Sequence, residues 1–195
     1  MSDSGMTVAR FLCREPIETR SSAGAAPRIT GYAAVWDAES EPMMGGDVVE
    51  IVRRGAFTRS LAAGTDIRAF AHHDQARPIG RRSAGSLKIR EDRHGLAVEI
   101  TPPDTTAGRD VLEEVRSGEV TGFSFGFNPG DGTTRWTFSD GDAPDVRELL
   151  EVDLVEVSPV AIPAYAATEA ELRSSWAVGS RRARLERQTA RLLAM

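Results

Sequence analysis

One serine in the stretch TGFSFGF, residues 121–127, has surroundings that could suit a nucleophile. If the stretch is a strand, alternation places its three phenylalanines on one face and Ser124, with Gly122 and Gly126, on the other. The phenylalanine face would join the core. The two glycines would let a second chain or a ligand approach Ser124 closely. The simpler interpretation is a bend in a sheet that carries an incidental serine.

The letters GFSFG also fit the nucleophile elbow of α/β-hydrolases, GxSxG. That motif needs a strand–turn–helix context and a histidine after the serine, whereas all three histidines precede Ser124. We therefore reject the elbow. A serine hydrolase of another type stays compatible with the sequence, because a catalytic triad is defined by geometry and not by chain order.

The candidate general bases are His72, His73 and His94. His94 lies in EDRHG, a predicted hairpin turn, and we interpret it as a solvated turn residue. The pair in AHHD ends a predicted strand, where alternation sends His72 and His73 to opposite faces. One of the two at most can face a given site, and two exposed loop histidines are the plainer alternative.

The candidate acids lie in LLEVDLVEVS, which contains Glu151, Asp153 and Glu156. Alternation puts Glu151 and Asp153 on one face and Glu156 on the other. Charges of this kind also protect the edges of sheets, and we assign that structural role to Glu156. A chymotrypsin-like arrangement with Asp104 as the acid ranks last, because no GDSGG-type loop supports it.

The elements that would position these residues are mostly short strands. The pattern predicts a hairpin within 7–36, a strand at 48–52, a short helix ending at Gly64, a strand entering 67–74 and a hairpin around EDRHG. A helix should run from an N-cap at Asp104 or Thr105 to Gly118, and a buried strand should follow from about residue 146. Many strands with few helices indicate an antiparallel barrel or sandwich with peripheral helices.

Composition narrows the function. A net charge of −5 over 195 residues gives no electrostatic case for nucleic acid. The single Cys13 and three dispersed histidines predict neither a disulfide framework nor a metal site, so we expect no cofactor. The sequence begins without a signal-peptide pattern and contains no membrane-length apolar run, so we expect a cytoplasmic protein without a membrane partner.

Three blocks resemble the prohead (capsid maturation) serine protease family of tailed phages. They are FAHHDQARPIG, GRDVLEEVRSGEVTGFSFGF and LEVDLVEVSPVAIPAYAAT. The family is related in fold to the herpesvirus assemblins, so the resemblance implies a mostly β, α+β fold: an assemblin-like antiparallel β-barrel with peripheral helices. We predict a protease domain at 1–170 and a basic helical or disordered tail at 171–195.

The resemblance also implies site residues. His73 matches the general base and Ser124 the nucleophile, and Glu151 takes the third position, with Asp153 as second choice. Gly122 and Gly126 would leave room for the substrate. The oxyanion hole would come from the backbone of SPVAIP, with donors at Ser158, Val160 or a neighbour, since proline has no N–H.

The activity implied is that of a serine endopeptidase inside the assembling procapsid, in the host cytoplasm. Its substrates and partners would be the scaffolding protein or scaffold domain, the major capsid protein and the protease itself. Because assemblins act as dimers, the resemblance also implies self-association. The alternative is an inactive scaffolding or interaction protein with the same fold, which would need a defect at His73, Ser124 or the acid; none is visible.

Overall fold

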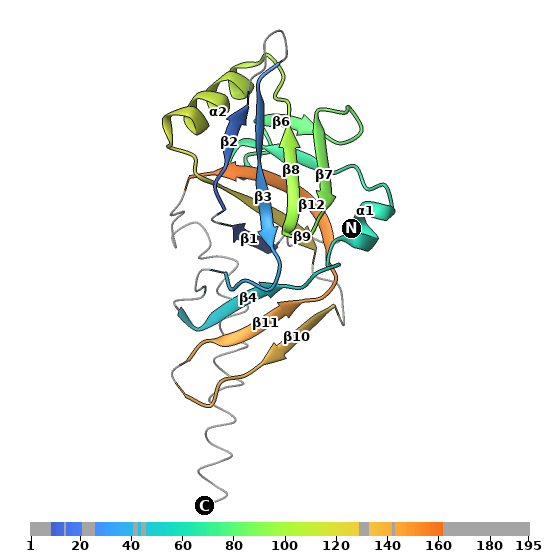
Figure 1. The fold of residues 1–195 in the computed structure, drawn as a ribbon, viewed down its shortest axis with the longest axis vertical. Coiled ribbons are helices and arrows are strands. Elements are labelled where there is room, and N and C mark those ends of the chain that lie inside the picture. The colour runs from blue at the N-terminus through green and yellow to red at the C-terminus, as the bar shows by residue number, and fades with distance from the viewer. Residues whose placement is uncertain are drawn as a thin grey trace, which may run out of the picture. The chain divides into compact units, whose positions relative to one another are not determined.

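The computed structural model describes residues 9–13, 15–20, 26–40, 43, 46–128, 133–141 and 143–161. They belong to a unit that spans Met1–Ile162 (Figure 1). The predicted tail at 171–195 and the domain boundary at residue 170 lie outside the described residues.

The described strands form three sheets. The five-stranded sheet has the order β1 (Ala9–Cys13), β9 (Gly122–Asn128), β12 (Asp153–Val160), β5 (Arg68–Phe70) and β6 (Pro78–Arg81). The four-stranded sheet has the order β2 (Glu18–Arg20), β3 (Arg28–Val35), β8 (Gly95–Ile100) and β7 (Leu87–Glu91). The three-stranded sheet has the order β10 (Thr134–Thr137), β11 (Asp145–Leu149) and β4 (Val48–Val52).

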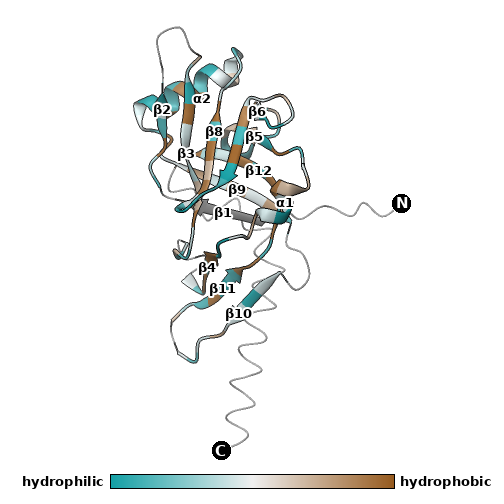
Figure 2. Ribbon diagram, turned by 45° about the vertical axis from the view of Figure 1, so that its right-hand side comes forward, coloured by the Kyte–Doolittle hydropathy of each residue, from teal (hydrophilic) through white to brown (hydrophobic). Residues whose placement is uncertain are grey.

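Two short helical elements and one longer helix accompany the sheets. They are α1 (Thr58–Ala62), the 3-10 turn η2 (Ala71–His73) and α2 (Thr106–Ser117). The side chain of Thr105 accepts a hydrogen bond from the N–H of Gly108, and Gly118 ends α2 with a φ of 82°. Both ends of the predicted helix are confirmed, and α2 shows both hydrophilic and hydrophobic residues in Figure 2, as expected for a helix that buries one stripe. None of the described helices has the length and apolar character needed to cross a membrane.

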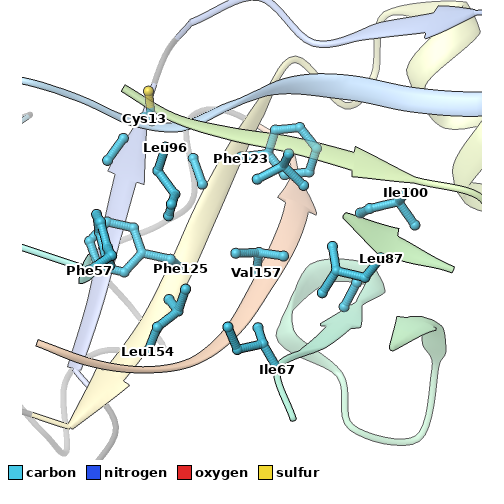
Figure 3. Close-up of a cluster of buried hydrophobic side chains, with 14 of the residues drawn as sticks. Cys13, Phe57, Ile67, Leu87, Leu96, Ile100, Phe123, Phe125, Leu154 and Val157 are labelled. Atoms are coloured by element: carbon cyan, nitrogen blue, oxygen red, sulfur yellow. The ribbon is translucent and has the colours of Figure 1, made fainter. Parts of the chain in front are cut away.

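The core lies around the inner face of β9. Phe123, Phe125 and Phe127 are fully buried, and the ring of Phe125 meets that of Phe57 edge to face at 5.1 Å (Figure 3). Gly31 on β3 makes room for this packing, because a Cβ atom there would lie 3.1 Å from the ring of Phe123. The predicted phenylalanine face is confirmed, and it fixes β9 so that Ser124 is on the opposite side of the strand.

Several strand pairings differ from the predictions. The first two predicted strands do not pair with each other: β1 pairs with β9, and β3 pairs with β2 and β8. The predicted strand from residue 146 is two strands in different sheets, β11 and β12, and the predicted turn region before it contains β10. Alternation reveals which face of a strand is buried but does not name its partner.

The barrel is not confirmed. The described strands form open sheets, and two of the pairings, β12 with β5 and β11 with β4, are parallel. The mostly β class with few helices is confirmed. The parallel pairings arise because long stretches of chain separate the paired strands, so that one strand can return beside another in the same direction.

Candidate active site

Three distant segments meet in the five-stranded sheet. β12 lies between β9 and β5, antiparallel to the first and parallel to the second. Its register places Ser158 opposite Ser124, and cross-strand neighbours of this kind have Cβ atoms about 4.5–5.5 Å apart. Both serine side chains are buried. The candidate nucleophile therefore lies in the interior of the sheet, beside β12.

The candidate base projects from a tight turn at the end of β5. The chain leaves the strand at Phe70 and enters η2, where His72 and His73 have φ values of 54° and 62°. Left-handed backbone is uncommon for residues other than glycine, and such conformations cluster at functional sites. Two backbone hydrogen bonds of 3.0 Å close the turn. The N–H of Asp74 donates to the carbonyl of Ala71, and the N–H of Ala71 donates to the carbonyl of Arg77.

The two histidines have different carboxylate partners. Nε2 of His72 lies 2.9 Å from Glu114 of α2, where both side chains are partly exposed. Nδ1 of His73 lies 2.5 Å from Oε1 of Glu156 on β12, where both side chains are largely buried. The predicted divergence of the pair holds, but its cause is the turn geometry of η2 and not strand alternation.

A hydrogen-bonded chain extends from His73 through Glu156 to Ser158. The hydroxyl of Ser158 donates to Oε2 of Glu156 at 2.5 Å, so the two oxygens of this carboxylate have different partners. Because Ser158 faces Ser124 across the sheet, the chain ends beside the candidate nucleophile. The histidine of η2 and the carboxylate of β12 are thus in contact, and β12 pairs alongside the strand β9 that carries Ser124. Serine, histidine and carboxylate are the residue set of a catalytic triad.

Comparison with known proteins identifies the family of the chain. The family model described as caudovirus prohead serine protease matches residues 15–180. The chain belongs to this family of serine proteases. The solved structure of the bacteriophage T4 capsid assembly protease matches with a TM-score of 0.56 and 9% identity, over 80% of this chain and 98% of that chain. At this identity the likeness concerns the fold. Comparison with curated proteins finds no significant match.

Glu151 is not the carboxylate that contacts His73 in the structure. Glu151 instead accepts a hydrogen bond from Nε of Arg59 at 2.7 Å, and Asp153 lies 2.9 Å from the same guanidinium group. All three side chains are about half exposed. The prediction that Glu151 is the carboxylate beside His73 is therefore corrected to Glu156, and Asp153, the second choice, is excluded from that position as well.

The choice of Glu151 rested on resemblance to the assemblins, and alternation placed Glu156 on the opposite face of the strand. Glu151 precedes β12, and the register against β9 shifts between Leu154 and Glu156, so faces assigned from Glu151 do not carry through the strand. Counting backward from Ser158 would have placed Glu156 on its face.

Helix α1 fixes the segment in which the register shifts. The hydroxyl oxygen of Ser60, a buried residue, accepts a hydrogen bond from the N–H of Leu154 at 3.0 Å. The N–H of Val152 donates to the carbonyl of Ala56 at 2.9 Å. Together with the ion pairs of Arg59, these contacts hold residues 151–154 immediately before Glu156.

The structure also describes three other residues considered in the sequence: His94, Gly122 and Gly126. His94 is an exposed residue of the β7–β8 turn, with its ring 4.5 Å from that of Tyr32, and its assignment as a turn residue is confirmed. Gly126 and Gly122 are opposite Glu156 and Val160 in the β9–β12 register. β9 is paired on both sides, so a substrate cannot add to it as a neighbouring strand. The described residues contain no cluster of three or more metal-ligand side chains.

The predicted oxyanion segment is only partly described. Ser158 and Val160 are opposite Ser124 and Gly122, and the carbonyl of Val160 accepts from the N–H of Thr121. The rest of the SPVAIP stretch extends beyond Ala161, outside the described residues. The donors of the oxyanion hole stay a prediction.

Proposed function

We propose that this phage capsid maturation protease uses Ser124 as nucleophile, His73 as general base and Glu156 as the carboxylate that orients His73. The observation that carries the proposal is the 2.5 Å contact between Nδ1 of His73 and Glu156, on a strand whose register also brings Ser124 alongside. A carboxylate at Nδ1 holds the proton on that nitrogen and leaves Nε2 to accept the proton of a serine hydroxyl.

The reaction is a two-step acyl transfer. His73 removes the proton of Ser124 as the hydroxyl oxygen attacks the peptide carbonyl, and then gives a proton to the leaving amine. Glu156 stabilises the imidazolium during both transfers. Water then releases the acyl group by the same path in reverse. Gly122 and Gly126 keep the strand free of side-chain bulk on either side of Ser124, as required if the scissile peptide is to approach it.

The substrates that we propose are the scaffolding protein or scaffold domain, the major capsid protein and the protease itself, inside the assembling procapsid. Membership of the prohead protease family supports a place among capsid proteins. Self-association, and closure of the described sheets into an assemblin-like barrel, belong to the same proposal and rest on resemblance to the assemblins.

Co-expression with the major capsid protein of the same phage tests the proposal. The parent protease should produce truncated capsid protein, and intact mass should locate the cleavage sites. Ser124→Ala should fold normally and leave the capsid protein intact, because loss of the hydroxyl removes the nucleophile. Full processing by Ser124→Ala would contradict the nucleophile assignment.

A further inference from the structure

Ser158 has no role in the proposed triad, yet it contacts the triad carboxylate. Its side chain is fully buried on β12, two residues after Glu156, and its hydroxyl donates to Oε2 at 2.5 Å. A hydrogen bond from a hydroxyl to an ionised carboxylate is short and about twice as strong as a neutral one. The contact therefore affects the same group that holds His73.

The hydroxyl fixes the direction in which the carboxylate points. Glu156 has one oxygen on His73 and the other on Ser158, so rotating the carboxylate away from the imidazole would break both hydrogen bonds. A glutamate has one more rotatable bond than an aspartate, so it needs a second anchor to present one oxygen at a constant angle. Ser158 provides that anchor from within the strand.

Few other charged or titratable groups face this carboxylate. From η2 the contact is His73, while His72 of the same turn is paired with Glu114. On β5 the register partner of Glu156 is Arg68, an exposed residue, and on β9 it is Gly126. Among the described residues, the hydrogen-bond partners of the Glu156 carboxylate are therefore His73 and Ser158.

We propose that Ser158 is a positioning residue of this protease, which acts through Glu156 to hold the imidazole of His73 and to set the pH range in which His73 is a base. This rests on the proposed function. The hydroxyl stabilises the carboxylate most when His73 is neutral, because an imidazolium would itself support the negative charge. Removing the hydroxyl makes the His73–Glu156 pair bind a proton more readily.

The first test is kinetic. Ser158→Ala should lower kcat by about tenfold to a hundredfold with little change in KM, and should move the acid limb of the kcat/KM profile upward by about one pH unit. Ser158→Thr, which keeps a hydroxyl, should recover part of the lost turnover. The matched control is Ser40→Ala, another buried serine, whose hydroxyl oxygen accepts from the N–H of Glu50 in a different sheet. It should leave the pH profile unchanged.

The second test needs no substrate. An NMR titration of the three histidines should show His73 protonating at higher pH in Ser158→Ala than in the parent, with His72 and His94 as internal references. A Ser158→Ala protein that is merely less stable, with the parent's kcat, acid limb and His73 titration, would overturn the inference. If the parent cleaves no substrate but the His73 titration still differs between Ser158→Ala and the parent, the role of Ser158 toward His73 holds and the proposed function is contradicted.

Discussion

His73 and Glu156 are 83 residues apart in the sequence, and their side chains meet at 2.5 Å in a largely buried position. Glu151, only five positions before Glu156, is bound to Arg59 at the surface. The two glutamates therefore make a direct comparison of a carboxylate that contacts the base with one that does not.

Glu156→Gln should reduce turnover by about 10⁴-fold, because an amide cannot hold the same imidazole tautomer or stabilise the imidazolium. Glu151→Gln should keep nearly the parent's activity and change the free energy of unfolding by about 1 kcal/mol or less, since it loses an exposed ion pair. Cleavage time courses and melting temperatures of both variants provide the measurement. An inactive Glu151→Gln beside an active Glu156→Gln would return the role to Glu151.

The adjacent histidines offer a second matched pair. Both have left-handed backbone, in which asparagine is tolerated better than alanine, so His72→Asn and His73→Asn avoid adding the same strain. His73→Asn should be inactive because no base remains. His72→Asn should keep most of its activity, since it loses a partly exposed contact with Glu114. Equal losses in the two variants, measured on folded protein, would indicate that the turn and not the His73 ring is what matters.

Ser60→Ala should destabilise the protein by about 1–3 kcal/mol, because the buried N–H of Leu154 would lose its acceptor. Activity should fall as well, since this N–H lies in the segment that sets the register of Glu156. Denaturant unfolding gives the free energy. Ser86→Ala is the control: the hydroxyl of Ser86 accepts from the N–H of Arg81 at an exposed position and should matter far less. Equal costs for the two variants would argue against a special role for Ser60.

A buried ion pair in the three-stranded sheet should make stability depend on pH. Glu50 accepts a hydrogen bond from Arg147 at 2.8 Å, and burial raises the pKa of the Glu50 carboxyl from 4.5 to about 7, although Arg147 acts to lower it. Between these two pKa values the folded protein binds more protons than the unfolded chain, so this contribution is present below pH 4.5 and is lost as pH rises toward about 7.

Glu50→Gln removes this titration. Over the same pH window the parent's free energy of unfolding should fall relative to that of the variant, whatever the difference between them at the acid end. Urea unfolding of both proteins across the window measures the slope. A constant difference between parent and variant would show that Glu50 keeps the same charge in both states.

The local elements of this fold were predictable from the sequence. The strand at Val48–Val52, the β7–β8 hairpin and α2 with its cap at Thr105 follow from short-range signals: alternation, turn residues and capping. The partners of β1 and the parallel pairings were not predictable, because hydrophobic alternation is the same whichever strand lies alongside.

The same distinction explains the site. Ser124 and His73 were predicted as site residues from the family resemblance, and the structure places both next to β12. The face of Glu156 was predicted wrongly because it depends on the register shift after Leu154. The N–H of Leu154 is held by Ser60, a residue almost a hundred positions away. A purely local alternation rule cannot include such a contact.

The strand order of the central sheet has a consequence for when the enzyme can act. β12 is the last described strand along the chain, yet it occupies the middle of the sheet, between β9 and β5. A ribosome-bound chain that has not yet released β12 has neither Glu156 nor the strand that joins the histidine turn to the serine strand. Sheets whose central strand arrives late close through long-range contacts. If Glu156 has the proposed role, the protease becomes active only after β12 has been synthesised and has joined the sheet.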